Sequence, residues 1–208
     1  MKIRLDDTLL EMEARSVAEA LELGRGAAEK QGRLIIEVHA DGSPLPAAML
    51  DEPPDHDAGI GELRLLSTLP GPFIQTTLLD AADLLGQVRT DQAEAVRLFQ
   101  SGHIEEAFGP LQRALTSWAI VRDVVDKSAT LGAIDPESVR VEAADGAVRT
   151  GPAHIDTLSD NLTEIKRALQ IQDFSALAEV LEIDMNLEAN QWERFLQALA
   201  DQAGQIGA

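Results

Sequence analysis

The sequence predicts an α+β protein, with a small β-α-β-β unit over residues 1–70 and a mainly α, antiparallel four-helix bundle over residues 73–208. Three observations predict this architecture. Apolar residues alternate with polar ones in parts of the first 68 residues, as they do in strands. After Pro70-Gly71-Pro72, apolar residues recur at alternating steps of three and four, as on one helix face. Two short alternating runs around an Asp-Gly pair predict a β-hairpin inserted at about 137–151.

Three strands and one helix are expected in the first unit. The strands fall near residues 3–5, at 33–39 and at 62–67, and an Ala-, Glu- and Leu-rich helix spans residues 12–31. Two glycines inside that helix indicate either a break or a close approach of its backbone to the sheet: Gly24 and Gly26.

Strand periodicity assigns faces to the second and third strands. Leu34, Ile36 and Val38 are expected on one face, and Leu63 and Leu65 are expected to point inward.

Two long helices open the bundle and meet at Gly102. We call the stripe of each helix that is expected to face the other helices its seam. The expected seam of the first is Ile74, Leu78, Ala81, Leu85, Val88, Gln92, Ala95 and Phe99. The expected seam of the second is Ile104, Phe108, Leu111, Leu115, Trp118, Arg122, Val125 and Ala129. Pro110 falls within the first two turns of the second helix or at a kink.

A third helix is expected from about Ile155 and a last one from Phe174, with a break at 172–173. Their seams are Ile155, Leu158, Leu162, Ile165 and Leu169, then Phe174, Leu177, Leu181, Met185, Trp192, Phe195 and Leu199. Short connections make an antiparallel bundle the simplest way to bury these stripes.

The two helical hairpins resemble each other at an offset of 70 residues. This offset places four residues of the first hairpin on identical residues of the second: Glu94, Arg97, Gln100 and Leu111 on Glu164, Arg167, Gln170 and Leu181. The pattern suggests duplication. Residues 95–115 also resemble one tetratricopeptide unit, which implies a helix-turn-helix and nothing further.

Composition limits the classes of partner. The chain has no Cys, which excludes thiol chemistry and fits a reducing compartment. Its net charge of −19 opposes binding to nucleic acid or to anionic membranes. The first residues contain acids instead of the apolar run of a secretory signal, and a cytoplasmic location is expected.

Catalytic motifs are missing from the sequence. It contains no His-Glu-x-x-His or Glu-x-x-His metal motif, nucleophile elbow, phosphate-binding loop or dinucleotide fingerprint. We therefore expect no cofactor and lean against an enzyme.

The acidic loop at residues 51–57 is the one candidate metal site. Asp55, His56 and Asp57 combine carboxylates with an imidazole, but adjacent residues rarely converge on one ion. A solvated loop is the favoured interpretation.

Polar residues on the apolar seams form a second cluster, which contains Gln92, Arg122, Asp184 and Glu188. We expect Arg122 to lie level with Asp80 and Asp83 and to form an ion pair that fixes the register. The alternative is a polar pocket in which Arg122, Asp184 and Glu188 bind a ligand.

Three large aromatic residues lie at seam positions: Trp118, Trp192 and Phe195. Core packing is the favoured role, and an anchor at a protein interface is the alternative.

Together these features favour a non-enzymatic interaction protein, such as an adaptor, assembly factor or chaperone-like binder, with a protein partner or a second copy of the chain. Its acidity and helical content are typical of bacterial export chaperones, which is an analogy of class only. The alternative is an enzyme or a regulator that binds a small ligand or a metal.

Overall fold

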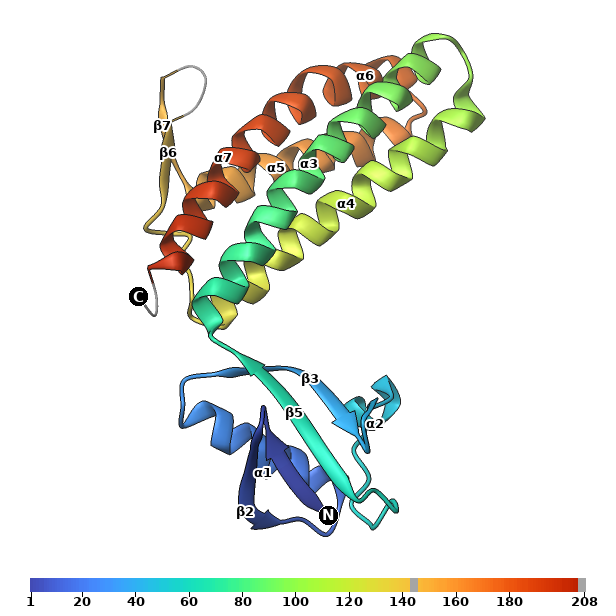
Figure 1. The fold of residues 1–208 in the computed structure, drawn as a ribbon. Helices are drawn as coiled ribbons and strands as arrows, with labels where there is room; N and C mark the ends of the chain where they lie inside the picture. Colours follow the sequence, from blue (N-terminus) through green and yellow to red (C-terminus); the bar gives the residue numbers. More distant parts are fainter. Residues whose placement is uncertain (143–145, 206–208) are drawn as a thin grey trace. The chain divides into compact units, whose positions relative to one another are not determined.

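The computed structural model describes residues 1–142 and 146–205 and is a mixed α+β structure. Met1–Phe73 form one compact unit, and the residues from Ile74 onward form a second. A five-stranded sheet belongs to the first unit, and long helices with a two-stranded hairpin belong to the second (Figure 1). The predicted fold class is confirmed.

The sheet of the first unit has the strand order β2-β1-β5-β3-β4, with β1 parallel to β5 and the other neighbours antiparallel. Its elements are β1 (Lys2–Leu5), β2 (Thr8–Glu13), α1 (Val17–Glu29), β3 (Leu34–Ala40), β4 (Ser43–Pro44), α2 (Ala47–Asp51) and β5 (Glu62–Thr68). The predicted β-α-β-β order therefore omitted β2, β4 and α2.

The helix predicted from Met12 begins later in the structure, at Val17. Asp6 has a φ of +51°, and the chain reverses there so that β2 pairs with β1. Leu, Glu and Met in Thr8–Glu13 favour a helix locally, but pairing with β1 overrides this weak preference.

Apolar packing between the sheet and α1 forms the core of the first unit. Ile3, Leu63 and Leu65 are fully buried. A Cβ atom on Gly24 would lie 2.7 Å from both terminal carbons of Leu65, whereas one on Gly26 would meet nothing within 4 Å. The close approach predicted from the glycines thus occurs at Gly24.

The predicted face of β3 is confirmed at Val38 and wrong at Ile36. Ile36 is 51% exposed, although Val38 is buried as expected. The β3–β5 register shifts between Ile35 and Glu37, and this irregularity turns Ile36 away from the core.

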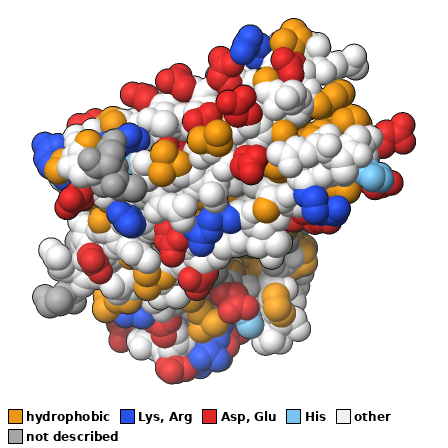
Figure 2. Space-filling view, turned by 90° about the horizontal axis from the view of Figure 1, so that it is seen from above, with side chains coloured by type: hydrophobic (Ala, Val, Ile, Leu, Met, Phe, Trp, Pro, Cys, Tyr) orange, Lys and Arg blue, Asp and Glu red, His pale blue; other side chains and the backbone are white. Residues whose placement is uncertain are grey.

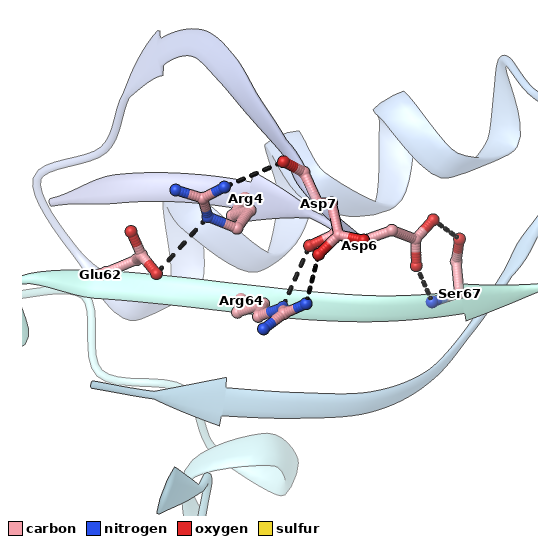
Figure 3. A network of polar contacts seen from close by, with 6 residues as sticks. All are labelled: Arg4, Asp6, Asp7, Glu62, Arg64 and Ser67. Atoms are coloured by element: carbon pink, nitrogen blue, oxygen red, sulfur yellow. Dashed lines mark hydrogen bonds and ion pairs between the residues drawn. The ribbon is translucent and has the colours of Figure 1, made fainter. Parts of the chain in front are cut away.

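Asp6 joins the β1–β2 turn to β5. Its carboxylate accepts the backbone N–H of Ser67 at 2.7 Å and the Ser67 hydroxyl at 2.8 Å (Figure 3). Arg64 donates to the Asp6 carbonyl at 3.0 Å and to Asp7 at 2.7 Å. Desolvation alone would raise the pKa of Asp6, but the Ser67 hydrogen bonds and the charges of Arg33 and Arg64 outweigh it and lower that pKa.

Four long helical segments and a β-hairpin make up the second unit. The elements are α3 (Pro70–Gln100), α4 (Ile104–Thr130), β6 (Arg140–Glu142), β7 (Val148–Thr150), α5 (Gly151–Gln170), α6 (Phe174–Glu179), the π-helical turn η1 (Val180–Asp184) and α7 (Met185–Gly204). The segments α6, η1 and α7 follow one another without a break, and we call them the last helix. The Asp-Gly turn predicted for the hairpin includes Asp145, which lies outside the described residues.

Every predicted seam residue of α3 is buried, and Pro110 lies within the first two turns of α4. The predicted seam of α4 is confirmed at Leu111, Trp118 and Val125, which are buried, and is wrong at Phe108 and Arg122, which are exposed. Ile104, Leu115 and Ala129 are only partly buried against the core. The buried stripe of α4 is Ala107, Leu111, Ala114, Trp118, Val121, Val125 and Ser128. Small residues on this stripe let neighbouring helices approach closely, and Phe108, which is larger, lies at its margin with 42% of its surface exposed.

The turns of the two hairpins share one hydrogen-bond pattern at the offset of 70 residues. In the first, Gly102 has a φ of +80° and the N–H of His103 donates to the Leu98 carbonyl. In the second, Gln172 has a φ of +57° and the Asp173 N–H donates to the Ala168 carbonyl. Both are helix C-terminal caps of the Schellman kind.

No helix among the described residues is long and apolar enough to span a membrane.

Candidate functional site

Arg122, Asp184 and Glu188 are not brought together. Arg122 lies on the solvent side of α4 with its Nε 3.7 Å from Asp126, and Asp184 is exposed at the end of η1. Their predicted place on the seam is therefore wrong, and so is the register pair of Arg122 with residues 80 and 83. Glu188 is buried as predicted, with 2% of its surface exposed.

A different arginine links α3 to α4. Arg113 donates from Nε to Asp91 at 2.9 Å and from Nη2 to Glu94 at 3.2 Å. The hydrogen bond to Asp91 is the largest influence on the pKa of Arg113, which is raised. An ion pair therefore joins α3 and α4, but it is not the one that was predicted.

The acidic loop is solvated. His56 Nδ1 lies 3.7 Å from Asp55, with both side chains largely exposed, and Asp57 accepts the backbone N–H of Gly59 at 2.9 Å. Within the part of the chain that the structure describes, no group of three or more His, Asp or Glu side chains is placed to hold a metal ion.

Trp118, Trp192 and Phe195 form the aromatic core of the bundle. The two indole rings meet edge to face at 5.7 Å, and Trp192 and Phe195 do so at 5.5 Å. All three expose 1% or less of their surface. The structure places them where core packing was expected, and away from accessible surface.

A buried polar pair that the sequence did not reveal lies beside this core. His154 of α5 is fully buried, and its Nδ1 lies 3.9 Å from Glu188 Oε1. Both imidazole nitrogens and that oxygen have no hydrogen-bond partner among the described residues. The available signal was spacing, since His154 lies four residues before Leu158 on the buried stripe of α5.

The end of the bundle that carries both hairpin turns has a cluster of apolar side chains. We call Phe99, Phe108, Ile171, Phe174 and Ile183 the bundle-end surface. Phe99 and Phe174 stack at 5.5 Å, and Phe108 meets them edge-on at 5.9 and 6.2 Å. Four helical segments therefore contribute to one surface, and Figure 2 shows hydrophobic side chains gathered at the right-hand end of the view.

Much of this surface is open to solvent. Phe108, Ile171 and Ile183 expose 42%, 61% and 58% of their surface, whereas Phe99 is buried. A hollow of about 590 Å³ is lined by Phe99, Phe174 and Ile183. Both the open apolar side chains and the hollow make this end of the bundle accessible to a binding partner.

Acidic residues border the bundle-end surface. Glu179 and Glu182 line the hollow, and Glu105 and Glu106 occupy the first turn of α4. An apolar centre with an acidic border suits contact with another macromolecule better than acid–base chemistry, because the border residues are exposed to water.

No family model, curated protein or solved structure matches the chain.

Proposed function

We propose that the protein is a non-enzymatic interaction module, of the adaptor, assembly-factor or chaperone-like kind, that binds a protein partner on the bundle-end surface. One observation carries this proposal: three large apolar side chains are 42–61% exposed around a phenylalanine stack in a chain with a net charge of −19. Single exposed apolar residues are ordinary, but an apolar cluster with a polar border is typical of interaction sites.

The border defines the partner's chemistry. Glu105, Glu106, Glu179 and Glu182 favour a partner segment with an apolar centre flanked by Lys or Arg. We place this interaction in the cytoplasm, since the chain has no Cys, and the analogy with bacterial export chaperones agrees with such a role.

The test is co-purification from the source organism. A tagged full-length chain, expressed near its native level, is isolated at moderate and at high salt, and the recovered proteins are identified and quantified by mass spectrometry. Ile171→Glu and Ile183→Glu place charges on the bundle-end surface at exposed positions that tolerate them. Ile120→Glu is the matched control, because Ile120 lies on α4 outside the bundle-end surface and is 50% exposed.

We expect one protein to be recovered in a stoichiometric amount. Its complex with the chain should persist at high salt, because burial of apolar surface stabilises it. Recovery should be lost with both surface variants and kept with the control variant. Equal recovery with all variants would contradict the proposal. Recovery of the chain alone, with a dimer mass that the two variants abolish, would replace the heterologous partner with a second copy.

A further inference from the structure

A second concave site lies between α3 and the last helix, beside η1. It is a groove of about 320 Å³, to which α3 contributes residues between Arg89 and Gln100 and the last helix contributes Leu181, Glu182 and Asn186. Its size is at the small end of the range for sites that hold small molecules.

Hydrogen bonds join the two helices at Arg89 and Gln100, the first and last residues of α3 that line the groove. Arg89 donates to Asn190 at 3.1 Å and to Glu193 at 2.9 Å. Gln100 donates to Glu182 at 3.1 Å. These contacts hold the two walls of the groove together.

Gln92 lies in the wall of this groove and is 2% exposed. Neither its amide nitrogen nor its amide oxygen has a hydrogen-bond partner among the described residues. Buried amides in native proteins nearly always have partners, because an unmade hydrogen bond is costly. Both amide atoms are closed to solvent, so the side chain must turn toward the groove to meet a ligand that offers both a donor and an acceptor.

Arg97 supplies the positive charge of the groove. It lies on the exposed rim, and its guanidinium forms no ion pair or hydrogen bond with any described residue. Arg89, by contrast, is already paired with Glu193. An unpaired guanidinium in a chain with 36 acidic residues is available for a carboxylate from outside.

We propose that this groove binds a small organic carboxylate that also carries a carboxamide or an equivalent donor–acceptor pair. Arg97 binds the carboxylate, and Gln92 pairs with the amide in the interior of the groove. Val96 and Leu181 are buried and provide apolar contact for the atoms between these two groups. The groove shares Glu182 with the border of the bundle-end surface, but the inference rests on Gln92 and Arg97, which belong to the groove alone.

The test uses malonamate, succinamate and glutaramate, which carry one carboxylate and one carboxamide separated by one, two or three methylene groups. Butyrate and butyramide are the matched probes that lack the amide or the charge. Binding to the full chain is measured by isothermal titration calorimetry at low salt. We expect at least one of the three to bind with a Kd in roughly the millimolar range, and about tenfold more tightly than either matched probe.

Variants assign the contacts. Arg97→Gln is expected to weaken binding by about tenfold or more, because it removes a charge-assisted hydrogen bond. Arg167→Gln is the control, since Arg167 occupies the equivalent place in the second hairpin and pairs with Glu164 there. Gln92→Leu is expected to reduce the affinity for the amide probe to that for butyrate.

The proposal is overturned if none of the three amide probes binds more tightly than butyrate, or if Arg97→Gln and Arg167→Gln have equal effects. Amide-dependent binding that persists in Gln92→Leu would overturn the role of Gln92. Circular dichroism of each variant separates loss of binding from loss of the fold.

Discussion

Gly24→Ala and Gly26→Ala should change the stability of the first unit in opposite directions. Both glycines lie in α1, where alanine is favoured over glycine by about 0.5–1 kcal/mol. Gly26→Ala should show this gain, because its new methyl group meets nothing within 4 Å.

Gly24→Ala should lose more than it gains. Its Cβ would lie 2.7 Å from both terminal carbons of Leu65, a fully buried side chain on a central strand of the sheet. Inserting a methylene-sized group into a packed core costs about 1–3 kcal/mol. The two variants should therefore differ by that amount, which is roughly a fivefold to 160-fold difference in the unfolding equilibrium constant.

Hydrogen exchange of the full chain, read by mass spectrometry on peptides from α1 and β5, measures this difference as a ratio of protection factors. Peptides from α4 serve as an internal control, because they belong to the other unit. Leu65→Val should recover part of the loss in Gly24→Ala by removing the contacting carbons. Equal protection in the two glycine variants would refute the packing argument.

Three further predictions concern single contacts. Asp6→Asn should destabilise the first unit near neutral pH, as measured by hydrogen exchange on β1 at a series of pH values. The pKa of Asp6 is lower in the folded state than in the unfolded state. The extra stability of the wild-type protein is therefore present above the unfolded-state pKa and is lost as the pH falls through the folded-state pKa. Trp192→Ala should lower the free energy of unfolding of the bundle by about 3–5 kcal/mol in urea denaturation followed by circular dichroism, whereas Ile120→Ala should change it little. His154→Leu should destabilise the bundle by leaving Glu188 buried without its polar neighbour, and adding Glu188→Met should restore stability; additive effects in this double-mutant cycle would contradict the pairing.

Helix phase could be predicted from the sequence where large apolar residues mark a single stripe. On α3, the predicted seam is buried throughout, including its one polar member, Gln92. On α4, large apolar residues such as Phe108 and Leu115 flank a stripe that contains Ala107 and Ala114. The prediction placed the largest apolar residues on the seam, whereas close packing between the helices requires small residues there. The same choice of helix face wrongly placed Arg122 on the seam.

Strand β2 was missed for a related reason. The segment Thr8–Glu13 is mostly exposed, so burial leaves little periodic signal in its sequence. Its conformation follows from pairing with β1 after the reversal at Asp6, which is a tertiary effect.

The sites were less accessible to sequence reasoning than the fold. A buried polar group is recognised by the absence of partners, as at Gln92 and His154, and that absence depends on every helix packed around it. Exposure of an apolar residue likewise depends on where its helix ends. Phe174 was predicted as a seam residue, and it does pack, but on Phe99 and Phe108 at the open end of the bundle.

Comparison of the two hairpins separates what the turns require from what the bundle-end surface adds. The turns at Gly102 and Gln172 make the same hydrogen bonds with different side chains around them. Phe108 has Ala178 as its counterpart at the offset of 70 residues, and the second hairpin folds the same turn without an aromatic ring there. The turn therefore does not require Phe108, and a ring that is 42% exposed contributes less to stability than a buried one. Under the proposed function, the exposed part of the Phe108 ring is a contact for the partner, and its packed part contacts Phe99 and Phe174.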